Sequence, residues 1–145
     1  MKRILCFDYG EKRVGVAISD KSRIIASPLE TIATIDIIDF ITKFVSKEEI
    51  YCFVIGLPKN LNNSDLDITK KVYIFSDKLK LEFSNIPIYF EDERYTSKIA
   101  KQTIINSGLS KSKRKDKGNI DKISACIILQ SFLEKRDNQN VFDKK

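Results

Sequence analysis

The pattern of apolar and polar residues near the start of the chain predicts a hairpin. Two apolar runs, residues 4–7 and 14–18, flank a polar turn that contains Gly10. Burial of these runs would fix the register of a β-hairpin in which Asp8 ends the first strand. Asp8 could serve a site at this edge of the sheet, or it could simply accept hydrogen bonds from amides of the turn.

A third strand and an amphipathic helix are predicted next. The short apolar run at residues 24–26 follows a polar turn and would complete an antiparallel meander of three strands. Between residues 35 and 46 apolar residues recur at helical spacing, with Asp39 and Lys43 on the opposite face. This helix would lead into the next strand. Its apolar stripe comprises Ile37, Ile38, Ile41, Phe44 and Val45.

The middle of the chain alternates between strands and helices. The run at residues 52–56 is apolar without alternation, as in a strand that is covered on both faces. Residues 57–65 are rich in turn formers and predict a loop, and a second helix follows around Val72. The strand predicted at residues 86–90 leads into four charged residues, Glu91, Asp92, Glu93 and Arg94.

Two helices and a basic connector complete the pattern. A helix is predicted at residues 96–107, ending before a glycine. Residues 111–118 are strongly basic and contain almost nothing that could pack in a core. The last helix is predicted at residues 119–136, with Asn119 as its cap, and residues 137–145 are interpreted as a frayed tail.

Together these elements predict an α/β fold. Three antiparallel strands followed by two parallel strands would form a five-stranded mixed sheet with helices on both faces, in a single domain spanning residues 1–136. Right-handed crossovers would place the strand at residues 52–56 beside the first strand. Because ligands gather at the carboxyl ends of parallel strands, Asp8, the loop after Gly56 and the acids after residue 90 should meet at one edge.

Composition excludes several kinds of chemistry. The 145 residues include no histidine, which excludes serine–histidine triads, histidine general bases and imidazole zinc sites. Cys6, Cys52 and Cys126 lie in apolar runs without the spacing of metal ligands, so we expect buried thiols. No window reaches the apolar length of a membrane span, and we expect a cytoplasmic protein without a membrane partner.

Charge and one further acid point towards a phosphate-bearing partner. The net charge of +6 favours a polyanion such as nucleic acid. In the last helix Asp121 has small neighbours, Ser124 and Ala125, so this face could approach the sheet closely and bring the acid to the same edge. Alternatively, Asp121 only complements the helix dipole, and Glu93 is only a surface acid beside an arginine.

Four motifs in order resemble the signature segments of the YqgF family. They are Asp8-Tyr9-Gly10 with Arg13 and Gly15, Gly56-Leu57-Pro58, Asp92-Glu93-Arg94 with Thr96, and Lys117-Gly118 with Asp121. The resemblance spans nearly the whole chain. It implies an RNase H-like fold and a nuclease, because the family comprises proteins assigned as Holliday-junction resolvases related to RuvC and as nucleases maturing the 5′ end of pre-16S ribosomal RNA.

The same resemblance implies an acidic catalytic site. The family's acids would fall on three positions: Asp8, Glu93 and Asp121. Asp92 is a less favoured candidate for the middle acid. Two departures are Asn63, where the family often has glycine, and Tyr-Thr-Ser at residues 95–97 in place of Leu-Thr-Thr. Asparagine tolerates positive φ and serine keeps the hydroxyl, so we expect loop detail to differ and the reaction to be the same.

Carboxylates without histidine favour hard metal ions. Converging acids repel one another unless cations lie between them, and oxygen ligands at Asp8, Glu93 and Asp121 suit Mg²⁺ or Mn²⁺. Two such ions could activate a water and stabilise the leaving oxygen of a phosphodiester. Tyr9 and Tyr95 could stack on bases or be buried at the edge of the sheet. Phosphate contacts are predicted for five basic residues: Arg13, Arg94, Lys113, Arg114 and Lys117.

The function we predict is 5′-end maturation of pre-16S rRNA in ribosome biogenesis, with Holliday-junction resolution as the alternative. Phosphate contacts do not distinguish precursor RNA from branched DNA. A nucleic-acid-binding module without catalysis needs only the basic surface, and metal dependence would separate it from an enzyme. The hairpin also resembles the phosphate loop of actin-like kinases, but those need a second lobe for which this chain has no room. Monomer and homodimer both fit, although symmetric cleavage of a junction would need two copies.

Overall fold

Five strands and three α-helices make up the described part of the chain. The computed structural model describes residues 2–57, 63–92 and 117–139, with side chains for 2–57, 67–92 and 122–136. In chain order the elements are β1 (Arg3–Tyr9), β2 (Arg13–Ser19), β3 (Ala26–Ala33), the 3-10 helix η1 (Thr34–Asp36), α1 (Ile37–Val45), β4 (Ile50–Leu57), α2 (Asn63–Glu82), β5 (Ile88–Asp92) and α5 (Lys117–Gln139).

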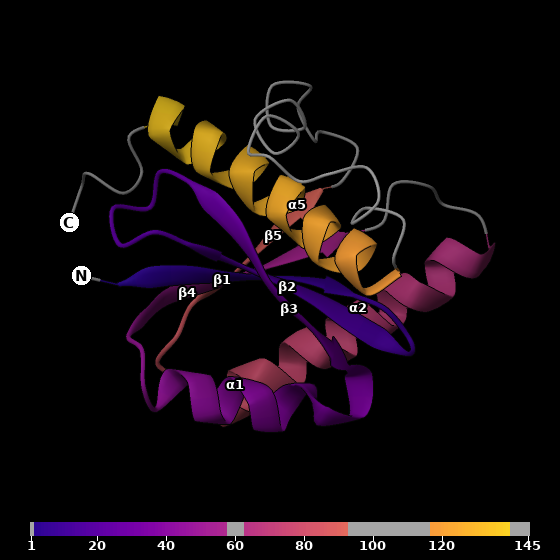
Figure 1. The fold of residues 1–145 in the computed structure, drawn as a ribbon. Helices are drawn as coiled ribbons and strands as arrows, with labels where there is room; N and C mark the ends of the chain where they lie inside the picture. Colours follow the sequence, from indigo (N-terminus) through magenta and orange to yellow (C-terminus); the bar gives the residue numbers. More distant parts are fainter. Residues whose placement is uncertain (1, 58–62, 93–116, 140–145) are drawn as a thin grey trace.

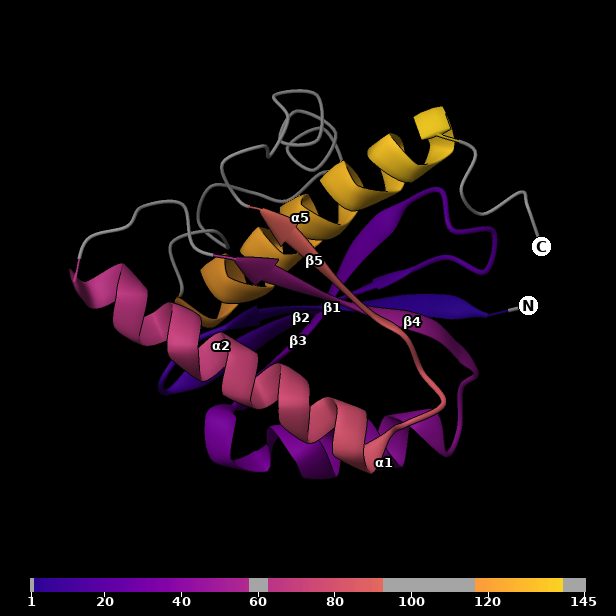
Figure 2. The ribbon, with the colours of Figure 1, turned by 180° about the vertical axis from the view of Figure 1, so that it is seen from behind.

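The strands form one mixed sheet in the order β3-β2-β1-β4-β5. β1 and β2 pair antiparallel, as do β2 and β3, whereas β4 runs parallel to both β1 and β5. The predicted mixed sheet is therefore confirmed, and so is the position of the fourth strand beside the first. β1 is central, and the carboxyl ends of β1, β4 and β5 lie at one edge of the sheet (Figures 1 and 2).

Helices cover both faces, as predicted. α5 crosses one face, and α1 and α2 cover the other (Figures 1 and 2). The period of two along β1 separates its side chains: Ile4 and Cys6 pack in the core under α5, whereas Leu5 and Phe7 pack in the core of α1 and α2. The same alternation places Asp8, two residues after Cys6, on the α5 face.

The three cysteines are free and buried, as predicted. All three belong to the core under α5. Burial raises the pKa of the Cys126 thiol to about 12. The pKa of Cys6 is also raised well above its ordinary value, first by burial and then by the negative charge of Asp8. Both thiols are therefore protonated and unreactive at neutral pH.

The third strand lies later than predicted, so the prediction at residues 24–26 was wrong. Ile24 and Ile25 supplied the apolar pattern but are 53% and 48% exposed. Their amides donate to Oδ1 of Asp20 at 2.7 and 3.0 Å and so belong to the turn. β3 is an edge strand, which is why it accommodates Pro28 and a bulge opposite Val16 and Ala17.

Both ends of the loop predicted at residues 57–65 belong to other elements, and residues 58–62 lie outside the described residues. Leu57 belongs to β4, and α2 already begins at Asn63. Asparagine, serine and aspartate signal turns, but they are also the residues preferred where helices begin. The strand predicted at 86–90 is shifted by two residues to β5, because the amide of Ile86 closes the turn after α2 by donating to the carbonyl of Phe83 at 3.0 Å.

The last helix is longer than predicted. α5 starts two residues before Asn119 and extends to Gln139, so Lys117 and Gly118 are helical, and so are residues 137–139 of the predicted tail. Helix ends commonly shift by such small amounts. The predicted helix at 96–107 and the connector up to residue 116 lie outside the described residues. Among the described helices none is long and apolar enough to cross a membrane.

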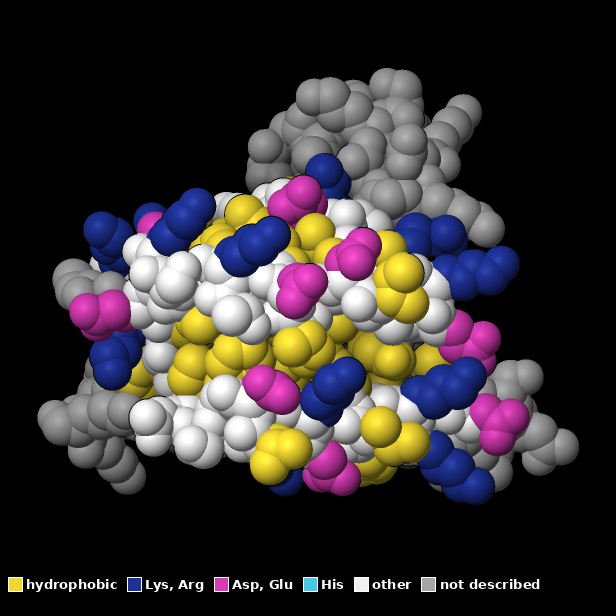
Figure 3. Space-filling model, turned by 90° about the horizontal axis from the view of Figure 1, so that it is seen from below, with side chains coloured by type: hydrophobic (Ala, Val, Ile, Leu, Met, Phe, Trp, Pro, Cys, Tyr) yellow, Lys and Arg dark blue, Asp and Glu magenta, His cyan; other side chains and the backbone are white. Residues whose placement is uncertain are grey.

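The α1 and α2 face exposes apolar side chains. Figure 3 shows apolar side chains gathered in the band between the two helices. Hollows of about 390 and 350 Å³ lie along this face, and Asp39 lines both. Neither hollow includes Asp8, which alternation assigns to the opposite face.

Candidate active site

Asp8 lies between two glycines in the middle of the sheet. It is half-buried near the end of β1, and its partner on β2 is Gly15. On the other side Phe7 pairs with Ile55, so the next residue along, Asp8, lies level with Gly56 of β4. Neither neighbour has a side chain on the α5 face. A phosphate or a metal ion could therefore approach the carboxylate from that face without meeting a side chain of either adjacent strand.

The turn after Asp8 is held by hydrogen bonds from Thr34. A Cβ at Gly10 would lie 2.7 Å from the carbonyl oxygen of Arg13, so this position requires glycine for steric reasons. Thr34 Oγ1 donates to the carbonyl of Gly10 at 2.8 Å, and the Thr34 amide donates to the carbonyl of Lys12 at 3.0 Å. These bonds join the hairpin to the segment after β3, and they hold the strand end that carries Asp8.

The row continues to a buried acid on β5. Gly56 pairs with Glu91, so Asp8, Gly56 and Glu91 lie level on three adjacent strands. Glu91 is 5% exposed. Ser131 Oγ donates to its carboxylate at 3.0 Å and Lys135 Nζ at 2.7 Å, both from α5. The α5 face of the sheet thus carries two carboxylates at its carboxyl edge.

The Cys6 thiol lies close enough to both carboxylates to respond to their charge. Its pKa is raised first by burial and further by the negative charges of Asp8 and Glu91. Both carboxylates therefore act on the same point under α5. Carboxylate oxygens are the ligands that Mg²⁺ and Mn²⁺ prefer, and the charge of Glu91 is already paired with that of Lys135.

The other predicted acids are placed only in part. Asp121 belongs to the first turns of α5, whose start lies on the same side of the molecule as the β1–β2 turn (Figures 1 and 2). Its side chain and all of Glu93 lie outside the described residues. Asp92 ends β5 and comes two residues after Phe90, so alternation assigns it to the face of α1 and α2, opposite Asp8.

Of the predicted basic residues, one has a described side chain. Arg13 begins β2 and is half-buried, and the period of two places it on the α5 face with Gly15. Lys117 is the first residue of α5, but its side chain is not described. The remaining predicted phosphate contacts lie outside the described residues: Arg94, Lys113 and Arg114.

Tyr9 is a packing residue. Its ring stacks on Phe75 of α2, with centroids 4.8 Å apart and planes 29° apart. Burial raises its pKa above the ordinary value for tyrosine. Of the two roles predicted for Tyr9, the structure supports burial at the edge of the sheet. Tyr95 lies outside the described residues.

Glu91 is the site residue that the sequence pattern did not single out. It was predicted to follow the strand as one of four charged residues, whereas it lies inside β5 and points to α5. Its spacing from Tyr89 could have indicated this position. The two residues are two apart and so share one face of the strand, and Tyr89 packs in the core under α5. Within the described residues, no group of three Cys, Asp or Glu side chains is arranged to hold a metal ion.

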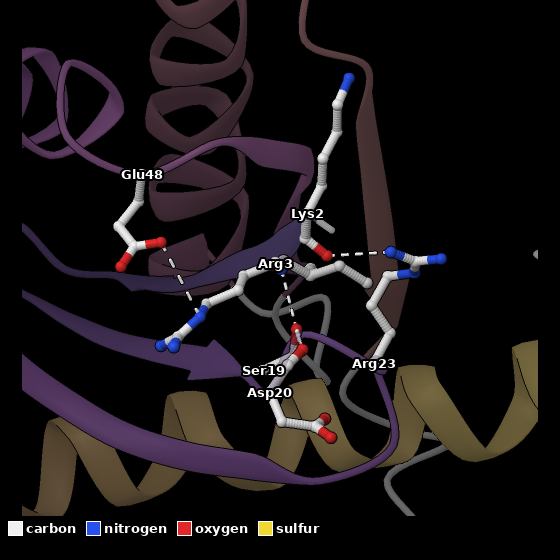
Figure 4. Close-up of polar contacts among 7 residues, drawn as sticks. Lys2, Arg3, Ser19, Asp20, Arg23 and Glu48 are labelled. Atoms are coloured by element: carbon white, nitrogen blue, oxygen red, sulfur yellow. Dashed lines mark hydrogen bonds and ion pairs between the residues drawn. The ribbon is translucent and has the colours of Figure 1, made fainter.

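A second polar cluster lies at the opposite end of β1 and is bonded internally. Figure 4 shows Arg23 donating to the carbonyl of Lys2 at 2.9 Å, and Arg3 facing Glu48 at 3.9 Å. Ser19 Oγ accepts from the amide of Ile4 at 2.8 Å. These contacts close the amino end of the sheet, so the carboxyl edge is the better candidate site.

The sheet order and the helices on both faces define an RNase H-like fold of the RuvC kind. Thermus thermophilus RuvC, solved in complex with a Holliday junction substrate, matches with a TM-score of 0.59 over 93% of this chain and 96% of that chain. The sequence identity is 10%, so this likeness concerns the fold.

The chain belongs to the RuvX family, also called YqgF. The sequence model of that family, described as Holliday junction resolvase, matches residues 2–135. Relatives named "Putative pre-16S rRNA nuclease" include a Phocaeicola vulgatus protein, 43% identical over 94% of this chain and 98% of its own length. Another, from Porphyromonas gingivalis, is 43% identical over 94% of this chain and 99% of its own. The predicted family is therefore confirmed, and the chain is a member of a nuclease family.

Proposed function

We propose that this protein is a metal-dependent nuclease that hydrolyses phosphodiester bonds at the carboxyl edge of its sheet. The observation that carries the proposal is Asp8: a carboxylate near the end of the central strand, between Gly15 and Gly56, on the face that α5 crosses. In this arrangement neither flanking residue has a side chain that would lie between the carboxylate and a metal ion on that face. We also propose that residues 1–136 act as one nuclease domain.

The proposed metal ligands are Asp8, Glu93 and Asp121. Oxygen donors suit Mg²⁺ or Mn²⁺, and we propose two ions. When bound, such ions activate a water and stabilise the leaving oxygen. The assignment of Asp92 to the opposite face supports Glu93 as the middle acid. The α5 segment that carries Asp121 starts on the same side of the molecule as the β1–β2 turn, which supports its inclusion.

Basic residues around this edge would hold the substrate. Arg13 lies on the same face as Asp8, where its guanidinium could contact a phosphate oxygen. We propose the same role for four further residues: Arg94, Lys113, Arg114 and Lys117. Phosphate contacts of this kind position a strand and carry no sequence information.

The substrate we propose is the 5′ flank of pre-16S rRNA, in the cytoplasm. Relatives that align with nearly the whole chain are named for that precursor. Branched DNA is the second candidate, because the matching family is described as Holliday junction resolvase. Symmetric cleavage of a four-way junction would require two copies of the chain. The oligomeric state measured with and without junction DNA therefore bears on the choice.

The first prediction concerns Asp8→Asn. The purified protein and the variant are offered precursor rRNA and four-way junction DNA side by side, with Mn²⁺ and with EDTA. The parent should cleave only with Mn²⁺. Asp8→Asn should lose several orders of magnitude in rate, because it removes a metal ligand, while thermal unfolding and binding of nucleic acid without metal stay close to the parent.

A matched variant controls for loss of any carboxylate. Asp39→Asn removes an exposed acid from α1, and α1 covers the other face of the sheet. It should cleave like the parent. Cleavage by Asp8→Asn at the parental rate would refute the nuclease site, and tight binding by the parent without cleavage of either substrate would favour the non-catalytic module. Whichever substrate is cut faster at equal concentration decides between rRNA and junction DNA.

A further inference from the structure

An ion pair with a buried carboxylate joins β5 to α5 beside the proposed site. The Glu91 carboxylate is almost fully buried and lies 2.7 Å from Lys135 Nζ, whose side chain is 40% exposed. Ser131, 1% exposed, donates its hydroxyl to the same oxygen of Glu91 at 3.0 Å. The carboxylate on the strand thus has two donors on the helix.

Stability alone gives a weak reason for this arrangement. Burying the Glu91 carboxylate costs hydration free energy that a partner exposed to 40% repays only in part, and a well-packed apolar pair often serves stability equally well. Apolar and aromatic contacts already join the same two elements: Tyr89 and Phe132 rings lie 5.8 Å apart, and the Arg136 guanidinium lies 4.6 Å from the Tyr89 ring. The ion pair additionally restricts how β5 and α5 lie relative to each other, because charge-assisted hydrogen bonds are short and geometrically specific.

The position of the pair relates it to the proposed acids. Glu91 lies level with Gly56 and Asp8 across the sheet and comes two residues before Glu93. Its partner Lys135 is on α5, the helix that also carries Asp121. The ion pair therefore connects the two elements from which two of the three proposed metal ligands arise.

We propose that Glu91 and Lys135 are positioning residues. Their ion pair sets β5 against α5 so that Glu93 and Asp121 can bind metal together with Asp8. This inference rests on the proposed function. Groups that support metal ligands without touching the metal typically change metal affinity or activity by about 10-fold to 100-fold when they are altered.

The test uses three substitutions in the full-length protein. Glu91→Gln keeps the shape of the side chain and a possible hydrogen bond to Ser131 but removes the charge. Lys135→Met keeps the length of the side chain and removes its charge, and Lys135→Arg keeps the charge. Mn²⁺ affinity is measured by calorimetry without nucleic acid, together with cleavage rate as a function of Mn²⁺, thermal unfolding, and nucleic-acid binding in EDTA.

The expected result is a loss in both charge-removing variants. Glu91→Gln and Lys135→Met should each bind Mn²⁺ about 10-fold to 100-fold more weakly than the parent, with nucleic-acid binding in EDTA unchanged. Lys135→Arg should stay close to the parent. A role through charge alone predicts a different pattern: Glu91→Gln would weaken Mn²⁺ binding, whereas Lys135→Met would strengthen it, and that outcome would overturn the positioning role.

A control variant at a different ion pair, together with the parent protein, distinguishes failure of this inference from failure of the proposed function. Glu48→Gln breaks the Arg3–Glu48 contact at the other end of β1 (Figure 4) and should leave Mn²⁺ affinity unchanged. If the parent binds Mn²⁺ no better than Asp8→Asn, the proposed function itself fails. If the parent binds and cleaves while the Glu91 and Lys135 variants match it, only this inference fails. If Glu91→Gln does not fold, Lys135→Met and Lys135→Arg still decide the question.

Discussion

Asp8 has two glycines as its neighbours across the sheet. Gly15 and Gly56 place no side chains beside it on the α5 face, while the buried residues before it hold β1 in the centre of the sheet. Glu91 is a second carboxylate in the same row, but its surroundings differ. Its carboxylate is level with Asp8 but is bonded to Ser131 and Lys135. Two acids in one row thus have different environments: Glu91 is almost fully buried, whereas Asp8 is half-buried between two glycines.

The buried thiols predict how stability depends on pH. The pKa of Cys126 is about 12 in the folded protein, and burial also raises that of Cys6. In the unfolded chain both thiols ionise near their ordinary pKa, so they favour unfolding once the pH exceeds it. Stability should be fully present below about pH 9 and should fall towards pH 12, by up to about 1.4 kcal/mol per pH unit for each thiol.

Urea unfolding at a series of alkaline pH values measures this effect. Lysines and tyrosines also titrate in that range, so the informative quantity is the difference between the parent and Cys126→Ala. The variant should be less stable at pH 8, because it loses buried contacts, but its stability should fall less steeply above pH 9. Parallel curves for the two proteins would contradict the assigned cause.

At the scale of elements, α5 holds the sheet together. It contacts all five strands, from β5 at one edge to β3 at the other. At the β3 edge Gln130, 4% exposed, accepts from the amide of Ala26 at 2.9 Å and donates to the carbonyl of Ile24 at 3.2 Å. At the β5 edge the Glu91–Lys135 pair plays the corresponding role. The helix that carries Asp121 is thus bonded at both edges of the sheet.

Gln130→Ala should destabilise the protein measurably. It leaves the buried amide of Ala26 without its acceptor, which costs about 1 to 3 kcal/mol in free energy of unfolding. Gln130→Met keeps most of the side-chain volume but removes both hydrogen bonds. Its free energy of unfolding should therefore fall by the part of the loss that is due to those bonds. Urea unfolding at neutral pH measures both.

An exposed hydrogen bond provides the comparison. Thr42 donates its hydroxyl to the carbonyl of Ile38 on the solvent side of α1. Thr42→Ala should change the free energy of unfolding by less than about 0.5 kcal/mol. A Gln130→Ala variant as stable as Thr42→Ala would mean that α5 is held at the β3 edge by apolar contacts alone.

At the scale of the whole molecule, charge should decide how nucleic acid binds. The chain carries six more basic than acidic residues, and the connector before α5 holds a dense basic run. We predict that replacing Lys113, Arg114, Lys115 and Lys117 by alanine flattens the dependence of log affinity on log salt. Each lost phosphate contact should reduce the slope by about 0.7 to 0.9, with similar weakening for all sequences.

The control carries the same change in charge on the other face. Four exposed lysines of α1 and α2 serve for it: Lys43, Lys70, Lys78 and Lys80. Their replacement by alanine should leave the slope close to that of the parent. A salt titration in which the connector variant keeps the parental slope would show that the connector is only a solvated linker, and that phosphates bind elsewhere.

Much of the fold follows from the sequence alone. Apolar runs and helical spacing predicted β1, β2, β4 and α1 within a few residues, and the right-handed crossover predicted that β4 lies beside β1. These features are local or follow from chain chirality. The third strand was misplaced because Ile24 and Ile25 have the pattern of a strand, whereas their amides are bound by Asp20 in the turn.

The candidate site was likewise predictable from the sequence only in part. Motif spacing singled out Asp8, and the absence of histidine limited its chemistry to carboxylates and hard metals. Only the tertiary structure revealed that Gly15 and Gly56 flank Asp8, and that Glu91 is buried against Lys135, 44 residues later in the chain. A sequence pattern reports which face a residue takes within its own element. The partner of that face depends on how strands and helices far apart in the chain pack together.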